Sequence, residues 1–206
     1  MKSALILDLD NTIYPVSSIA GYLFEKLFAL LDQNSLETDI IKGAKDELQR
    51  RPYHLVAEKY NFGAELTLQG LNLLRNIELN LPMQPFDDYQ HIKSNPIKKF
   101  LVTTGFSKLQ WSKIKMMGIE DDFVEIHIVD PETSQMTKKD VFAGILKRHF
   151  YAADEVLVVG DDPESEIKAA RELGIDTFLF DPGNIHPGAV VTYKTVCLRD
   201  VLNYIS

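Results

Sequence analysis

The segment ALILDLDNT, residues 4–12, places two aspartates directly after a run of four apolar residues. Such a run, Ala4 to Leu7, predicts a buried parallel strand. Asp8 and Asp10 are two residues apart, so in an extended backbone their side chains project to the same side. Paired carboxylates can divide metal binding, nucleophilic attack and proton transfer between them. For this motif alone, a strand end followed by a turn is the alternative interpretation.

Short apolar runs and helical patterns alternate through most of the chain. Four more runs have the length of strands, and three amphipathic stretches have the length of helices. This alternation predicts an α/β fold built on a doubly wound parallel sheet. The predicted strands are Phe100–Val102, Glu125–Val129, Val156–Val159 and Thr177–Phe180, and the predicted helices are Lys108–Met117, Lys138–Phe150 and Glu164–Leu173.

Residues 17–81 break this alternation. Leucines in this stretch recur at helical spacing, for example Leu23, Leu27 and Leu31. We therefore expect a helical subdomain at 17–81, inserted into a core that consists of 1–16 and 82–206. Proline-bearing segments, Tyr14-Pro15 before the insert and LPMQP at its end, suit hinges between the two parts.

The composition indicates a globular protein with a small-molecule partner. A chain of 206 residues with 45% apolar residues can bury a full core. Its net charge of -8 disfavours binding to nucleic acid or to a membrane surface. The single cysteine, Cys197, excludes an intramolecular disulfide and favours a cytoplasmic location, and no apolar run reaches membrane-spanning length. Monomer and homodimer both stay open.

Polar groups that suit a phosphate lie at the end of one predicted strand and at the start of one predicted helix. Thr103, Thr104 and Gly105 end the second strand, where a hydroxyl and a tight turn can face an anion. Lys138 and Lys139 begin a predicted helix, although an ammonium there meets the positive end of the helix dipole. A phosphoryl group at that position would gain from both the cation and the helix N-terminus. Taken singly, turn residues and surface lysines are the alternatives.

An acidic loop follows the fourth predicted strand. Asp161, Asp162 and Glu166 crowd its end, and such carboxylates repel one another unless a cation lies among them. A few oxygen ligands with room for water and a substrate phosphate suit Mg²⁺. Helix capping by the same acidic residues is the alternative.

These four motifs, in this order at successive strand ends, resemble the haloacid dehalogenase-like (HAD) hydrolase superfamily along nearly the whole chain. The resemblance implies a Rossmann-like core, a mobile helical cap and Mg²⁺ as cofactor. By it, Asp8 is the expected nucleophile, Asp10 the general acid and base, and Lys138 the charge-stabilising residue. Thr103, with Thr104 and Gly105, would bind phosphate. Asp8, the backbone carbonyl of Asp10 and Asp161 would hold the metal, supported by Asp162 and Glu166.

The expected function is hydrolysis of a small phosphate ester, such as a nucleoside monophosphate or a sugar phosphate, through an aspartyl-phosphate. Asp10 favours phosphoryl chemistry, because family members that dehalogenate lack an aspartate two residues after the nucleophile. The string DLDNTIYP resembles the branch that contains pyrimidine 5'-nucleotidases. A phosphomutase on the same scaffold and a catalytically silent phosphate-binding or metal-binding protein are the alternatives.

Some residues depart from the family pattern or stay ambiguous. Glu166 stands where aspartate is usual and Thr104 where many relatives have asparagine. Lys138 is favoured over Lys139, but both remain candidates for the catalytic lysine. Tyr53 and His54 begin a predicted helix of the insert, where contact with substrate is the alternative to the surface role that we expect for both.

Overall fold

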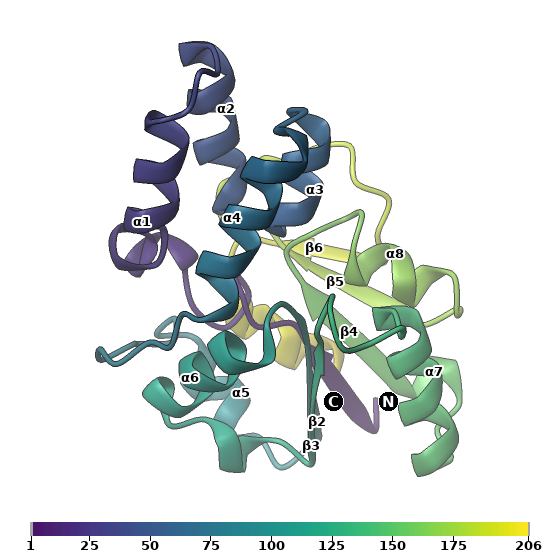
Figure 1. Cartoon of the computed structure of the whole chain (residues 1–206). Helices are drawn as coiled ribbons and strands as arrows, with labels where there is room; N and C mark the ends of the chain where they lie inside the picture. The colour runs from purple at the N-terminus through teal and green to yellow at the C-terminus, as the bar shows by residue number, and fades with distance from the viewer. Residues whose placement is uncertain (1, 206) are drawn as a thin grey trace.

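The computed structural model describes residues 2–205, which include a parallel sheet of six strands in the order β3-β2-β1-β4-β5-β6. This is the doubly wound order, in which strands are added on either side of β1 (Figure 1). The predicted fold class is therefore confirmed. The sixth strand is not among the predicted ones, because it has three residues and no apolar run. The strands are β1 (Ala4–Leu7), β2 (Lys98–Thr104), β3 (Glu125–Val129), β4 (Val156–Gly160), β5 (Asp176–Phe180) and β6 (Tyr193–Thr195).

Helices cover both faces of the sheet. In β1, Leu5 and Leu7 belong to one buried apolar cluster, whereas Ala4 and Ile6 belong to another on the opposite face. Burial on both faces explains why the strands are continuous apolar runs. The first cluster includes side chains of α5 (Tyr89–Ser94), α6 (Ser107–Met117) and η4 (Leu198–Tyr204), and the second those of α7 (Lys138–His149) and α8 (Glu166–Arg171). Short 3-10 turns are η1 (Val16–Ser18), η2 (Glu120–Asp122) and η3 (Ala153–Glu155).

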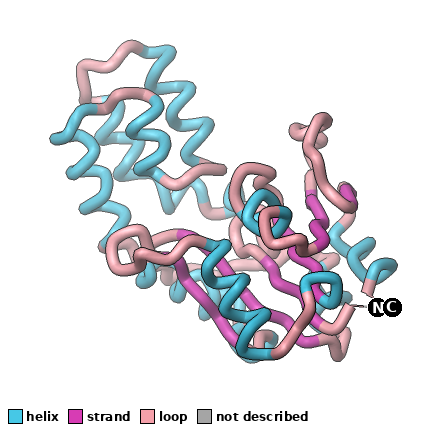
Figure 2. Tube along the Cα trace, turned by 90° about the vertical axis from the view of Figure 1, so that its right-hand side faces the viewer, coloured by secondary structure: helices cyan, strands magenta, loops and turns pink. Residues whose placement is uncertain are grey.

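The first four helices of the chain follow β1, and Figure 2 shows them as a group to one side of the sheet. They are α1 (Ala20–Asp32), α2 (Thr38–Leu48), α3 (Tyr53–Lys59) and α4 (Gly63–Arg75). Tyr53 links α3 to α4 by a hydrogen bond, in which its hydroxyl donates to the carbonyl of Leu66 at 2.8 Å. A Cβ at Gly70 would lie 2.2 Å from the Tyr53 ring, so this close approach requires glycine. The helices fall within 17–81, and the limits of two separate units stay a prediction.

The strand register brings the polar strand ends to one edge of the sheet. Leu7 pairs with Leu101 of β2 and with Val159 of β4. The residues that follow in each strand therefore meet at the carboxyl edge, below the four helices. The end of α6 matches its sequence signal, since its C-cap Gly118 is left-handed with φ of 63°. Gly174 is also left-handed, with φ of 71°, but α8 ends earlier, with Glu172 as its C-cap. Among residues 2–205, no helix is both long enough and apolar enough to cross a bilayer.

Candidate active site

Asp8 and Lys138 form a buried ion pair at the carboxyl end of β1. The Asp8 amide donates to the Val159 carbonyl at 3.0 Å, which fixes the residue at the sheet edge. Lys138 Nζ lies 2.7 Å from Asp8 Oδ1 and 2.8 Å from Glu166 Oε2. Lys139 instead pairs with Glu172 on the exposed side of α7. The structure therefore places Lys138, and not Lys139, beside Asp8.

Burial and charge shift the ionisation of this pair strongly. Burial raises the pKa of Asp8 to about 7, although Lys138 opposes the shift. Burial alone would lower the pKa of Lys138, but Asp8 and Glu166 hold that pKa above its ordinary value. Lys138 thus stays charged, whereas Asp8 loses its proton less readily than an ordinary aspartate. An additional cation at this position would lower the pKa of Asp8.

The acidic loop after β4 supplies the remaining carboxylates. Oxygens of Asp8, Asp161 and Glu166 lie within 4.8 Å of one another. Both Glu166 oxygens accept hydrogen bonds, from Lys138 and from the Asp162 amide at 2.7 Å. The Asp161 carboxylate has no hydrogen-bond or ion-pair partner among residues 2–205. Burial raises its pKa, and the negative charges of Glu166 and Asp8 raise it further. This donor set fits a hard divalent cation such as Mg²⁺, with Asp8 and Asp161 as available ligands.

Gly160, at the end of β4, leaves no room for a side chain. A Cβ at this position would lie 2.2 Å from Glu166 Cγ, and Glu166 in turn holds Lys138. We expect Gly160→Ala to displace Glu166 and to lower the free energy of unfolding by about 1–3 kcal/mol, as overpacking does. Urea denaturation measures the change. Gly188→Ala is the control, because no atom lies within 4 Å of its added Cβ, and an equal loss in both variants would contradict the explanation.

The predicted site residues line one cavity between the sheet edge and the four helices, with a volume of about 150 Å³. Its lining includes Tyr53 and His54, so the expected surface role is wrong for Tyr53, which is only 4% exposed. Tyr53 is buried because it packs on Gly70. The predicted residues that line the cavity are Asp8, Asp10, Thr103, Thr104, Gly105, Lys138, Asp161, Asp162 and Glu166.

The sequence as a whole matches a known family. A family model described as haloacid dehalogenase-like hydrolase matches residues 2–174, which is most of the chain. The chain belongs to the haloacid dehalogenase-like hydrolases. The expected superfamily and the expectation of a hydrolase are thereby confirmed. The pyrimidine 5'-nucleotidase-like branch is not confirmed and stays a prediction.

Three relatives illustrate what this hydrolase is similar to. A glyceraldehyde 3-phosphate phosphatase of Methanopyrus kandleri is 24% identical, with 86% of this chain and 83% of that protein covered. A ribulose-1,5-bisphosphate 5-phosphatase of Halopiger xanaduensis is 28% identical, with 88% and 86% covered. The magnesium-bound crystal structure of the putative HAD-hydrolase YfnB of Bacillus subtilis has a TM-score of 0.69 and 20% identity, with 100% and 99% covered.

In this hydrolase, Asp10 is held by three residues that belong to none of the four sequence motifs. Lys113 Nζ lies 2.7 Å from Asp10 Oδ1, and the Tyr14 hydroxyl donates to the same oxygen. Gln110 Nε2 donates to Asp10 Oδ2 at 2.9 Å and to Thr103 Oγ1 at 2.7 Å. Burial alone would raise the pKa of Asp10, but Lys113, assisted by Tyr14 and Gln110, holds that pKa below its ordinary value. Asp10 is thus ionised in this arrangement.

A signal for two of these residues exists in the sequence. Gln110 and Lys113 are three residues apart on α6, among the apolar Leu109 and Ile114 that this helix buries. Polar side chains on the buried face of a helix require partners, and so indicate a polar site on the facing element. Gly105 contributes to the same arrangement, since a Cβ there would lie 3.0 Å from the Gln110 side chain.

Proposed function

We propose that the chain is a Mg²⁺-dependent phosphomonoesterase that acts on a small phosphorylated metabolite through an aspartyl-phosphate on Asp8. The observation that carries this proposal is the buried contact of Asp8 with Lys138, beside the unpartnered carboxylate of Asp161. No hydrogen bond among residues 2–205 engages Asp8 Oδ2, so this oxygen is available for attack. Phosphatase-named relatives support the same reaction class.

In the first step, an Asp8 oxygen forms a bond to phosphorus while the bond to the leaving oxygen breaks. Lys138 stabilises the negative charge of the transferring group, and the Thr103 hydroxyl is a candidate donor to it. Asp10 supplies the proton of the departing alcohol. For this it must be protonated and must exchange its contacts with Lys113, Gln110 and Tyr14 for one with the leaving oxygen.

In the second step, water attacks phosphorus and the bond between phosphorus and the Asp8 oxygen breaks. The Asp10 carboxylate accepts the proton of this water, which restores the acid for the next turnover. Lys113 is suited to this half of the reaction, because it favours the ionised form of Asp10. Free phosphate leaves, Asp8 is again a carboxylate, and Asp10 is again protonated as it was at the beginning of the first step.

Asp8, Asp161 and the backbone carbonyl of Asp10 are the proposed holders of Mg²⁺, with Asp162 and Glu166 supporting the loop. When bound, the ion supplies positive charge that neutralises the transferring phosphoryl group. The magnesium bound in the YfnB crystal structure supports this choice of cation. Asp8 and Asp161 both have raised pKa values that a bound cation would lower.

Mg²⁺ binding is therefore expected to depend on pH. Asp8 must lose its proton to serve as a ligand, and its pKa is about 7 without metal. Mg²⁺ affinity should rise as the pH increases through 7, with release of protons on binding. Calorimetric titration at pH 6 and pH 8 measures both quantities. Equal affinity at the two pH values, with no proton release, would contradict the raised pKa of Asp8.

The relatives favour a sugar phosphate over a pyrimidine nucleotide as the substrate. Glyceraldehyde 3-phosphate and ribulose 1,5-bisphosphate are both phosphorylated sugars, and each is named for a relative that matches most of this chain. A pyrimidine 5'-nucleotidase and a phosphomutase rest on the sequence resemblance alone. A cytoplasmic location and the choice between monomer and homodimer stay predictions.

A panel of phosphate esters tests the proposed function. It contains p-nitrophenyl phosphate, triose, pentose and hexose phosphates, and nucleoside monophosphates, each with Mg²⁺ or with EDTA. We expect phosphate release that requires Mg²⁺ and is faster for sugar phosphates than for nucleotides. Release of phosphate without a product isomer excludes a phosphomutase. No release from any ester would contradict the proposal and favour a silent binding protein.

A further inference from the structure

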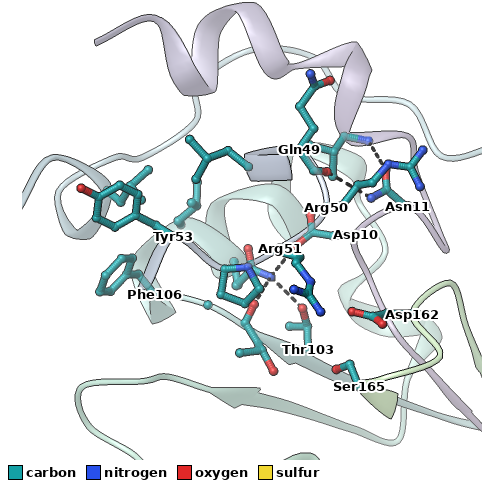
Figure 3. A pocket seen from close by; sticks show the side chains of 18 of the residues that line it. Asp10, Asn11, Gln49, Arg50, Arg51, Tyr53, Thr103, Phe106, Asp162 and Ser165 are labelled. Atoms are coloured by element: carbon teal, nitrogen blue, oxygen red, sulfur yellow. Dashed lines mark hydrogen bonds between the residues drawn. The ribbon is translucent and has the colours of Figure 1, made fainter. Parts of the chain in front are cut away.

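The loop between α2 and α3 is hydrogen-bonded to the segment that follows Asp8 and Asp10. Asn11 Nδ2 donates to the Gln49 carbonyl at 3.3 Å, and Asn11 Oδ1 accepts from the Val16 amide at 3.1 Å. Asn11 adopts a left-handed conformation with φ of 57°, which asparagine tolerates because its short polar side chain can hydrogen-bond locally. Arg50 and Arg51 follow Gln49 directly and line the cavity, so they are held close to the reacting groups (Figure 3).

These two arginines differ from Lys138 and Lys113, because neither pairs with Asp8 or Asp10. Lys138 already pairs with Asp8 and Glu166, and Lys113 already pairs with Asp10. Arg51 lies 3.1 Å from Glu47, but Glu47 also pairs with Lys59 at 2.6 Å. The Arg50 side chain makes no hydrogen bond, ion pair or ring contact with any described residue. Arg51 also acts on the Asp162 carboxylate, whose pKa it helps to lower against the larger effect of burial. Arg50 is therefore the guanidinium that is left without an ionic partner among the described residues.

The position of the arginines separates them from the phosphoryl group that is transferred. They also line a second hollow of about 600 Å³, whose other lining residues include Asp161, Asp162 and His186. In Figure 3, Arg51 extends toward the side of the cavity where Thr103 and Asp162 lie. Asp8, Thr103 and Lys138, which the proposed reaction assigns to the transferring group, line the first cavity but not this second hollow. The arginines can therefore contact a part of the substrate that extends beyond the transferring group.

We propose that Arg50 and Arg51 bind a second anionic group, a phosphate or a carboxylate, on the leaving part of the substrate. A guanidinium presents a planar pair of donors that matches either anion. An acidic protein repels such substrates unless the site itself provides positive charge. The substrate class is then a sugar bisphosphate or a phosphorylated sugar acid. This inference rests on the proposed phosphatase function.

Matched ester pairs test the inference. Fructose 1,6-bisphosphate with fructose 6-phosphate examines a second phosphate, and 3-phosphoglycerate with glycerol 3-phosphate examines a carboxylate. We expect the wild type to prefer the member with the second anion by about tenfold to a hundredfold in kcat/KM, as one or two charged hydrogen bonds provide. The favoured pair identifies the anion.

The variants Arg50→Gln and Arg51→Gln should reduce this preference, mainly through KM, and the double variant should abolish it. Arg51→Lys should retain part of it, because charge remains without the planar donor pair. Arg148→Gln is the control, since Arg148 pairs with Glu125 and does not line the cavity. Thermal melting of each variant shows whether it is folded.

The outcomes separate this inference from the proposed function. A wild type that hydrolyses p-nitrophenyl phosphate and both members of each pair equally overturns only the second-anion site. The same holds if the arginine variants lose activity equally on both members, because the arginines then bind the transferred group. A wild type that hydrolyses no ester overturns both proposals.

Discussion

Asp8→Asn is expected to lower kcat by about 10⁴-fold or more, because the amide cannot form the phosphoenzyme and removal of a nucleophile has effects of this size. The variant should stay folded. Asparagine has nearly the same shape as aspartate, and it removes a carboxylate whose pKa is raised by burial. Lys138 keeps its second partner, Glu166, at 2.8 Å. Steady-state hydrolysis of p-nitrophenyl phosphate with Mg²⁺ measures the loss.

Substitutions of two other aspartates provide a control and a comparison for Asp8→Asn. Asp121→Asn is the control, since Asp121 is an exposed residue of η2 and should leave kcat unchanged. Asp10→Asn should slow both proton transfers while the nucleophile stays intact, with a loss of about 10²- to 10⁴-fold. An Asp8→Asn enzyme with wild-type activity would rule out the assigned nucleophile.

Lys138→Met is expected to lower kcat by about 10²- to 10³-fold, because it removes the cation that meets the developing charge. It should also destabilise the fold by about 3–5 kcal/mol, since the buried carboxylates of Asp8 and Glu166 lose their partner. The effect on stability has a definite pH dependence. The loss should shrink at low pH, because Asp8, whose pKa is raised to about 7, is then protonated and no longer repels Glu166.

Lys139→Met provides the matched control for this substitution. Lys139 is the next residue of the same helix, but it pairs with Glu172 on the exposed surface. Removal of such a pair changes stability by about 1 kcal/mol or less. Urea unfolding at pH 5 and pH 8 compares the two variants. If both lose the same stability and activity, Lys138 has no special role beside Asp8.

Much of the core could be predicted because the apolar runs of the sequence coincide with the buried strands of the structure. The runs Ala4 to Leu7 and Val156 to Val159 are continuous apolar strands because helices cover both faces of the sheet. The strand β6 carries no such signal, because its three residues are only partly buried or exposed. Its place depends on pairing with β5, which a local pattern does not show.

The same distinction applies to the site. Carboxylates and threonines at strand ends were visible because parallel strands bring their carboxyl ends together. Gln110 and Lys113 reach Asp10 only through the packing of α6 against the sheet. Arg50 and Arg51 approach the site through a loop fastened by Asn11, which lies 38 residues before Gln49 in the sequence. The buried polar face of α6 indicates that Gln110 and Lys113 have polar partners, but no local pattern shows that the partner is Asp10 or that the arginines lie beside the site.

The most direct test of the central claim is to trap the phosphoenzyme. The enzyme would be mixed with excess substrate and Mg²⁺, quenched, and reduced with borohydride, which converts an aspartyl-phosphate into homoserine. Peptide mass spectrometry then locates the modified residue. We predict homoserine at residue 8. With p-nitrophenyl phosphate, whose leaving group departs without a proton from Asp10, the amount should increase in Asp10→Asn because only dephosphorylation is slowed. An active enzyme that yields no homoserine, or yields it at another aspartate, would contradict the assignment of Asp8 as nucleophile.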